Sequence, residues 1–324
     1  MSSGKWNRKV DAGCPAGRAA RCVLAERLEI LEKRLADVLR AKCGNSEAVH
    51  QLRVASRRAT AAVESFGVCL PHQQSRKLSS RVRSIRRAAG RIRDWDVLLL
   101  DLAQRVWQIG AEDAPGFDLL AGDSAARRSM AQEKFLKVCR KSQAPLRRRS
   151  KELVGAVSAA DRRGLTFGDI GRFRLTALAE RFFSQLGGPL ADVTDYHALR
   201  LALKPLRYAV EIFSGCFVPA LSEQISPQLE TLQELLGGIQ DCQLAAVRVR
   251  TRHSELEMEN LPGWPRYDSS LRSLLGDLER TVAVRCEKVQ QWREEQADPL
   301  RADLQRVLSE SPLGESVPAR RRNR

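Results

Sequence analysis

The sequence predicts an all-α protein with two similar halves. Apolar residues recur at three- and four-residue spacing along nearly the whole chain, and alanine, leucine, arginine and glutamate are abundant. No run alternates apolar and polar residues as a half-buried strand would. A segment that begins at residue 50 recurs 147 residues later, and 324 residues are enough for one large domain or two of ordinary size.

The expected helices are separated by clusters of proline and glycine. "GVCLPHQQ" ends the second helix, "IGAEDAPGFD" the third, "AADRRGLTFGD" the fifth, "LGGPLADVTD" the sixth, "GCFVPA" the seventh and "NLPGWPRYD" the eighth. In chain order we expect helices near residues 17–42, 47–69, 73–108, 118–140, 145–158, 170–186, 194–214, 221–254, 268–297 and 299–309. We expect a flexible N-terminus over 1–16 and a disordered basic tail over 310–324.

Two landmarks define the repeat. "HQLRVASRRATAAVESFGVCL" at 50–70 and "HALRLALKPLRYAVEIFSGCF" at 197–217 share nine of 21 residues. Further along, Gly90, Ile92 and Asp94 lie 147 positions before Gly237, Ile239 and Asp241. This period is too long for a solenoid, so the repeat predicts two pseudo-symmetric helical bundles from an internal duplication, over about 17–160 and 165–309.

The charge balance favours a polyanionic partner. Lysine and arginine number 55 against 39 acidic residues, which gives a net charge of +16 and a pI near 10. The chain contains neither a long apolar run nor the apolar core of a secretory signal, so we expect a cytoplasmic protein without membrane insertion. The eight cysteines form no C-x-x-C pair, so the sequence predicts no zinc module and no disulfide scaffold.

The repeated segment places basic side chains on one face of a helix. With His50 at zero, Arg53 lies at about 300° and Arg57 at about 340°, opposite an apolar face. His197, Arg200 and Lys204 repeat this stripe, and Arg207 adds a cation to it. A row of arginines is most often a solvated face, but its recurrence together with the histidine favours binding. Arginine suits phosphate because its planar donors engage two oxygens.

The helix with "RVRSIRRAAGRIRD" adds cations in the first half only. Its basic residues include Arg83, Arg86, Arg87, Arg91 and Arg93. In the second half Glu230, Gln233 and Glu234 occupy the positions of Arg83, Arg86 and Arg87. We expect Asp94 and Asp241 to be structural, by orienting an arginine of the stripe or capping a helix. Gly90 and Gly237 predict the close approach of another helix.

These residues resemble the CHAD family, the conserved histidine α-helical domain, over roughly residues 17–309. "HQLRVASRR" and "HALRLALKPLRY", followed by "AAGRIRD" and "LLGGIQD", carry the resemblance. It implies two four-helix bundles, a central basic groove or pore that binds inorganic polyphosphate, and no established catalysis or cofactor. The contacts implied for polyphosphate are His50, Arg53, Arg57, Arg58, His197, Arg200, Lys204 and Arg207, followed by Arg83, Arg86, Arg87 and Arg93. The biological role, including association with polyphosphate granules, stays open.

Two departures from the family pattern accompany the resemblance. Pro205 predicts a lost charge, a lost backbone hydrogen bond and a kink in the second stripe. The first copy, with "RRATAA", has no counterpart of Arg207. The E-x-E-x-K element of a triphosphate tunnel domain is not found, so we expect a stand-alone CHAD protein.

Two other functions compete with polyphosphate binding. Charge alone permits a nucleic-acid-binding module, but aromatic residues are only 5% of the chain and do not alternate with the stripes, so platforms for stacking bases are missing. An enzyme that uses His50 and His197 is the third hypothesis. The sequence contains no P-loop and no two-histidine metal motif, and nearby cations would depress the basicity of either imidazole. We therefore expect no catalytic residue and no metal site.

Overall fold

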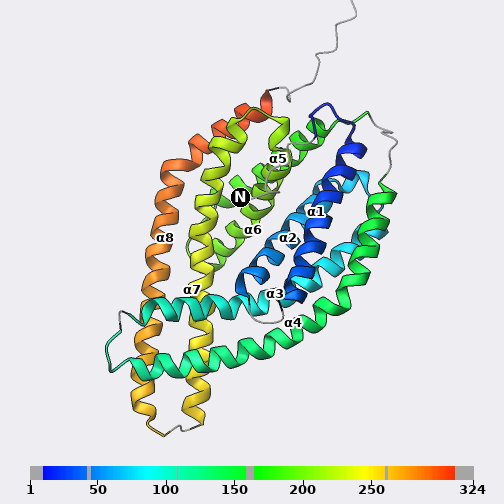
Figure 1. Ribbon diagram of the computed structural model, residues 1–324. Coiled ribbons are helices and arrows are strands. Elements are labelled where there is room, and N and C mark those ends of the chain that lie inside the picture. The colour runs from blue at the N-terminus through cyan, green and yellow to red at the C-terminus, as the bar shows by residue number, and fades with distance from the viewer. Residues whose placement is uncertain (1–9, 42–44, 108, 158–163, 260–261, 311–324) are drawn as a thin grey trace, which may run out of the picture.

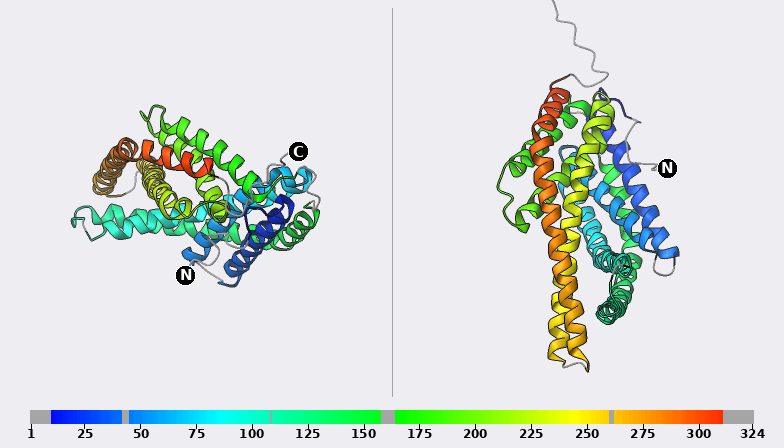
Figure 2. Two further views of the ribbon diagram at one scale, coloured as in Figure 1. Left: turned by 90° about the horizontal axis from the view of Figure 1, so that it is seen from above. Right: turned by 90° about the vertical axis from the view of Figure 1, so that its left-hand side faces the viewer.

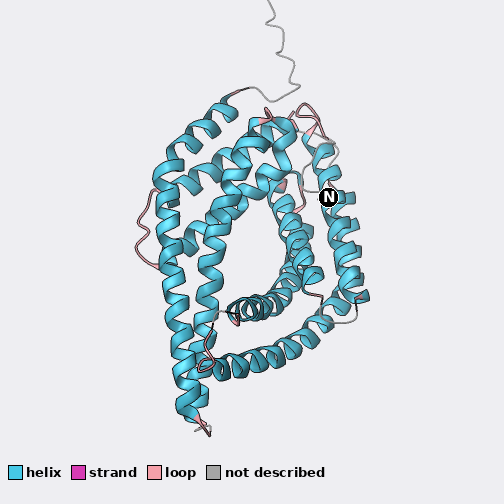
Figure 3. Ribbon diagram, turned by 60° about the vertical axis from the view of Figure 1, so that its left-hand side comes forward, coloured by secondary structure: helices cyan, strands magenta, loops and turns pink. Residues whose placement is uncertain are grey.

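The computed structural model describes residues 10–41, 45–107, 109–157, 164–259 and 262–310. The described part of the chain contains eight α-helices and no β-strand, which confirms the all-α prediction (Figures 1 and 3). The helices are α1 Ala16–Arg40, α2 Ser46–Ser65, α3 His72–Arg105, α4 Ala114–Ala156, α5 Phe167–Leu186, α6 Val193–Phe213, α7 Ser226–Met258 and α8 Trp264–Ser309. None of the described helices is long and apolar enough to cross a membrane.

Each half packs as a closed series of four helices. In the first half α1 contacts α2, α2 contacts α3, α3 contacts α4, and α4 returns to α1. The second half repeats this order from α5 to α8, with α7 and α8 side by side over most of their length (Figure 2). The short 3₁₀ helices Gly67–Cys69 and Ser214–Cys216, which follow α2 and α6, also lie 147 positions apart. The recurring features of the sequence therefore occupy recurring places in the fold.

The two stripe-bearing helices begin at capped termini. Asn45 caps α2, because its side-chain oxygen accepts the backbone N–H groups of Glu47 and Ala48 at 3.0 and 3.1 Å. At the start of α6, Asp192 and Asp195 form a reciprocal capping box. These caps fix where each helix starts and hence which face His50 and His197 occupy.

Two expected breaks do not exist. α4 and α8 are continuous where the sequence predicts ends near 141–144 and 298, so eight long helices replace the ten expected. Pro145 and Pro299 lie inside these helices, and Pro205 lies inside α6, which also continues to Phe213. An internal proline costs about 3 kcal/mol, but the buried face of α4 continues on both sides of Pro145 through Cys139 and Leu146. Tertiary packing outweighs the local cost.

The apolar core is shared between the halves. Phe66 and Phe213, at equivalent positions of the repeat, lie 5.9 Å apart between ring centroids, and Phe167 packs against both. A second apolar cluster joins the end of α3 and the start of α4 to the second half of α7 and the start of α8 (Figure 1). Leu98 of α3 and Leu271 of α8 are buried in this cluster. Two sets of four helices are present, and each apolar cluster contains residues from both sets.

The N-terminal segment before α1 is packed where the structure describes it. Residues 1–9 of the expected flexible N-terminus lie outside the described residues, as do residues 311–324 of the expected tail. Ala12 is buried, and its carbonyl accepts the N–H of Gly168 at 2.8 Å. The carbonyl of Cys14 accepts the N–H of Phe167 at 2.8 Å. Residues 10–15 thus connect the start of α1 to the start of α5.

Candidate functional site

The structure brings the two basic stripes together. α2 contacts α6, and the positive charges of Arg200, Arg57, Arg53 and Arg86 all act on Lys204. Burial, followed by these charges, lowers the pKa of Lys204 from 10.5 to about 7. We call these five residues, Arg53, Arg57, Arg86, Arg200 and Lys204, the central cation cluster. Three helices supply it: α2, α3 and α6.

Equivalent arginines lie over equivalent glycines. A Cβ atom added to Gly90 on α3 would lie 3.1 Å from the Nη1 atom of Arg53, and one added to Gly237 on α7 would lie 4.0 Å from the Nη2 atom of Arg200. The neighbouring helices α2 and α6 approach these glycines through an arginine side chain. What passes over each glycine is the guanidinium of a stripe arginine, and a side chain at Gly90 would crowd it.

Asp94 and Asp241 lie beside these arginines. Asp94 forms an ion pair with Arg53 at 3.9 Å and another with Arg248 of α7 at 3.5 Å. Its backbone carbonyl also accepts a hydrogen bond from Arg248 at 2.9 Å. Burial raises the pKa of Asp241, while the charge of Arg200 opposes that rise. Each carboxylate therefore lies where it can orient an arginine of the stripe.

The two histidines lie beside equivalent positions of α3 and α7, but these positions hold different residue types. Burial, followed by the positive charge of Arg93 on α3, lowers the pKa of His50. His197 contacts the side chain of Gln240 through its Nδ1 atom, and Gln240 occupies the position equivalent to Arg93. The same helix-to-helix contact thus recurs in both halves, with a cation in one and an amide in the other.

Two buried donors remain without partners. The Nε atoms of Arg53 and Arg200 are buried, and neither forms a hydrogen bond within the described residues. A buried N–H without an acceptor costs about 1–3 kcal/mol. Because these donors occupy equivalent positions in the two halves, they provide paired hydrogen-bonding capacity for an anionic ligand.

Arg58 and Arg207 belong to a different set of contacts. The Nε atom of Arg58 donates to Glu211 at 2.6 Å, and Arg207 pairs with the same carboxylate at 3.0 Å. The side chain of Glu211 is only 1% exposed. Arg207 also pairs with Glu230 at 3.2 Å and packs against the ring of Tyr208. Acidic residues of the protein therefore pair with both guanidiniums: Arg58 joins α2 to α6 through Glu211, and Arg207 is held by partners on α6 and α7. Their contact with polyphosphate stays a prediction.

The remaining predicted cations lie along α3. Arg86 is half-buried, and burial followed by the charge of Arg57 lowers its pKa. Arg83 and Arg87 are exposed, and Arg93 is half-buried beside His50. On α7 the equivalent positions hold Glu230 and Gln233, both of which bind Arg207. The basic surface is therefore extended by α3 and not by α7.

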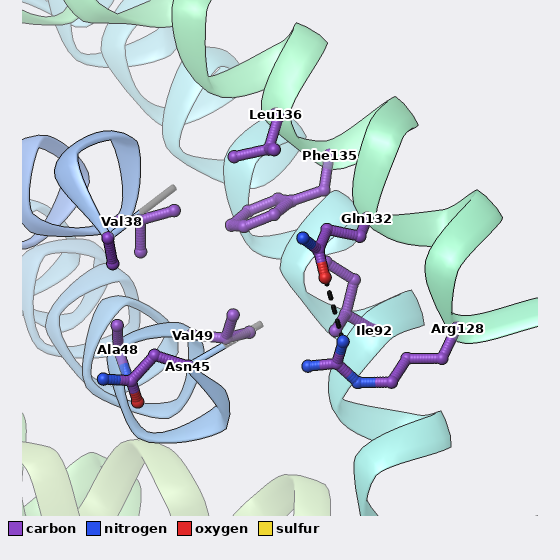
Figure 4. Close-up of a pocket in the computed structure, with 10 residues that line it drawn as sticks. Val38, Asn45, Ala48, Val49, Ile92, Arg128, Gln132, Phe135 and Leu136 are labelled. Atoms are coloured by element: carbon purple, nitrogen blue, oxygen red, sulfur yellow. Dashed lines mark hydrogen bonds between the residues drawn. The ribbon is translucent and has the colours of Figure 1, made fainter. Parts of the chain in front are cut away.

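Of the other hollows, one of about 210 Å³ between α3 and α7 is lined by the predicted contact Arg93 and by Asp241. The pocket in Figure 4, between α1, α2 and α4, encloses only about 20 Å³ and has room for one water molecule. Hollows of about 530 and 440 Å³ lie beside Phe183 and Phe173 of α5. No group of three or more His, Cys, Asp or Glu side chains among the described residues is arranged to hold a metal ion.

Sequence reasoning missed Arg248. This arginine packs over the ring of Trp95 at 4.3 Å and binds Asp94 from the other half of the molecule. The sequence alone predicts neither contact, because both depend on how α3 crosses α7. The sequence likewise gives no signal for Glu211 of α6, which the structure buries away from solvent.

The chain matches a family model and several solved structures. The CHAD domain model matches residues 22–250. The crystal structure of the CHAD domain from the plant Ricinus communis has a TM-score of 0.64 and 22% identity, and the match covers 94% of this chain and 95% of that one. PptA from Streptomyces chartreusis has a TM-score of 0.66 and 17% identity over 87% of this chain and 100% of that one. No curated protein sequence matches. At these identities the two structures establish the fold alone.

Proposed function

The chain belongs to the CHAD domain family, and from this premise we propose that it binds linear inorganic polyphosphate in the central cation cluster. The observation that carries the proposal is the convergence of four arginines on Lys204, two of which have a buried Nε donor without a partner. Cations held this close repel one another unless an anion neutralises them, and a chain with a charge on each phosphate supplies that anion along its length.

The arrangement also explains how such a chain would be held. Arg53 and Arg200 offer planar donors from opposite halves, and Lys204 supplies a point charge between them. A bound polyanion favours the protonated form of Lys204, whose pKa is about 7 in the unliganded protein. We propose a binding role without catalysis, in a cytoplasmic protein, and the residues named here are its contacts.

Calorimetric titration tests the proposal. Purified protein is titrated with long-chain polyphosphate and with duplex DNA matched for phosphate, near physiological salt. We expect saturable binding of polyphosphate and much weaker binding of DNA, because the cluster lies between helices and has no exposed aromatic residue on which bases could stack. Equal affinities would instead favour the nucleic-acid hypothesis.

A pair of variants tests the assigned contacts. The double substitution Arg53→Ala with Lys204→Ala should weaken polyphosphate binding by about a hundredfold, because hydrogen bonds to charged groups contribute about 1.5–3 kcal/mol each. The control is Arg272→Ala with Arg280→Ala on α8, which also removes two charges but at exposed residues paired with Asp268 and Asp277. Circular dichroism verifies the helix content of both variants. Equal losses in the two variants would contradict the assignment.

A further inference from the structure

The second half of α4 carries a stretch rich in basic residues that contains no acidic residue. From Lys134 to Lys151 the sequence has eight cations and no acidic residue. The cations are Lys134, Lys137, Arg140, Lys141, Arg147, Arg148, Arg149 and Lys151. At 1.5 Å per residue this run spans about 26 Å of helix. A charge run of this length and density is not needed to form the helix.

One face of the run is packed and the other is basic. The buried residues Phe135, Cys139 and Leu146 lie within about 40° of one another around the helix axis, and they face α1 and α3. Seven of the eight cations lie on an arc of about 140° on the opposite side, and Lys134, Lys137 and Lys141 are all exposed. The outer surface of α4, at the edge of the molecule in Figure 1, is therefore a broad basic face.

Three lysines of this face lack the acidic partners that exposed arginines of α8 have, whereas Arg148 pairs with Glu152 at 3.6 Å. On α8 the exposed arginines Arg272, Arg280 and Arg306 each pair with an aspartate three or four residues earlier. Among the described residues, no acidic side chain pairs with Lys134, Lys137 or Lys141. Like charges three or four residues apart destabilise a helix by about 0.2–0.5 kcal/mol per pair. An anionic partner would remove that cost.

The basic face of α4 continues onto α3. From His72 to Arg93, α3 likewise has eight cations and no acidic residue. The two runs lie side by side, because α3 packs along α4 and Arg149 donates to the carbonyl of Lys77 at 2.9 Å. Within the α3 run, Arg83 and Arg87 are exposed. The charge of Arg83 acts on Arg86, which belongs to the central cation cluster. Cations thus extend from the cluster, across α3, to the outside of α4.

We propose that a long polyphosphate chain held in the central cation cluster continues across α3 onto the outer face of α4, which makes this face a determinant of chain length. The proposal rests on the function proposed above. A flexible chain can turn around α3, whose diameter with side chains is about 10 Å, whereas duplex DNA stays straight over about 500 Å. The run on α4 carries no exposed large apolar residue, so nothing anchors it in a lipid surface.

Chain length is the variable that tests this inference. Wild-type protein and two triple variants are titrated with tripolyphosphate, with long-chain polyphosphate and with duplex DNA. The first variant is Lys134→Ala, Lys137→Ala and Lys141→Ala, and the second, matched in charge, is Arg272→Ala, Arg280→Ala and Arg306→Ala. We expect the α4 variant to lose about tenfold in affinity for the long chain and nothing for tripolyphosphate, since each exposed charge contact contributes up to about 1 kcal/mol.

Each other outcome overturns one of the two proposals. If wild-type protein binds neither phosphate chain, the proposed function fails. If wild-type protein binds both and the α4 variant matches the α8 variant on the long chain, the inference about α4 fails while the function stands. A loss confined to duplex DNA would overturn the inference by showing that the face serves nucleic acid.

Discussion

At the scale of single residues, Lys204 connects the geometry of the site to pH. Its pKa is about 7 in the folded protein against an ordinary 10.5, so the unfolded chain holds more protons between these values. The free energy of unfolding therefore rises with pH from about 7 to about 10.5. We expect polyphosphate, bound as proposed, to raise the pKa of Lys204 again, so that binding above pH 7 takes up a proton.

This linkage predicts weaker binding of polyphosphate as the pH rises above 7, by at most about tenfold per pH unit. Calorimetry in buffers of different ionisation enthalpy measures the proton uptake directly. Lys204→Arg keeps its charge throughout and should bind with little pH dependence over this range. His50 is present in both proteins, so its imidazole contributes equally to the two pH profiles. The same pH dependence in wild type and Lys204→Arg would exclude Lys204 as the linked group.

The sequence predicts which face of each helix carries the cations, but it does not predict which residues of neighbouring helices pair with them. Helical angle alone places Arg53 and Arg57 on one stripe and Arg200 and Lys204 on the other, and the structure brings these four together. Arg207 has a suitable angle as well, yet Glu230 and Gln233 of α7 bind it. The helical angle gives the side of its own helix on which a side chain lies, whereas the ion pairs of that side chain depend on the residues of the neighbouring helix.

At the scale of helices, Glu211 joins the two halves. It accepts Arg58 from α2 and pairs with Arg207 from its own helix, and it is fully buried. Its equivalent in the first half, Glu64, is exposed, and the position equivalent to Arg207 is Thr60. The missing counterpart of Arg207 therefore has a structural meaning, because only one copy of the repeat builds the buried ion-pair cluster.

Removal of this carboxylate should destabilise the protein. Glu211→Gln removes the charged partner of half-buried Arg58 and one of the two acidic partners of Arg207. We expect the free energy of unfolding to fall by about 3–5 kcal/mol in denaturant titrations. Glu64→Gln is the matched control at the equivalent, exposed position, and it should stay within about 0.5 kcal/mol of wild type. A small effect of both substitutions would show that the cluster contributes little to the packing of α2 against α6.

Helix type and order follow from the sequence, but the uninterrupted length of α4 and α8 does not. The spacing of apolar residues predicts the helices correctly, since it reports the buried face of each. Pro145 and Pro299 favour breaks in any local reading, and only the packing of α4 on α1 and α3 and of α8 on α5 and α7 shows why the helices continue. Local propensity is a weak constraint once a long face is buried.

At the scale of the whole molecule, cations from both halves meet at the place where the halves join. Arg53 and Arg57 come from α2, and Arg200 and Lys204 come from α6. Their mutual repulsion opposes the contact of α2 with α6, while the rings of Phe66, Phe167 and Phe213 favour it. The unliganded protein thus carries strain at its centre that an anion would relieve, a trade of stability for function.

This arrangement predicts that polyphosphate stabilises the protein by binding across the two halves. At a ligand concentration about a hundred times the Kd, the free energy of unfolding should rise by about 2.7 kcal/mol, which for a protein of this size raises Tm by about 4 °C. Differential scanning calorimetry with long-chain polyphosphate measures the shift, and the Arg53→Ala, Lys204→Ala double variant should lose most of it. Orthophosphate at the same total phosphorus concentration separates bridging from simple screening, since a free ion neutralises charge without linking α2 to α6. A rise in Tm as large with orthophosphate as with the polymer would show that the cluster needs only counterions.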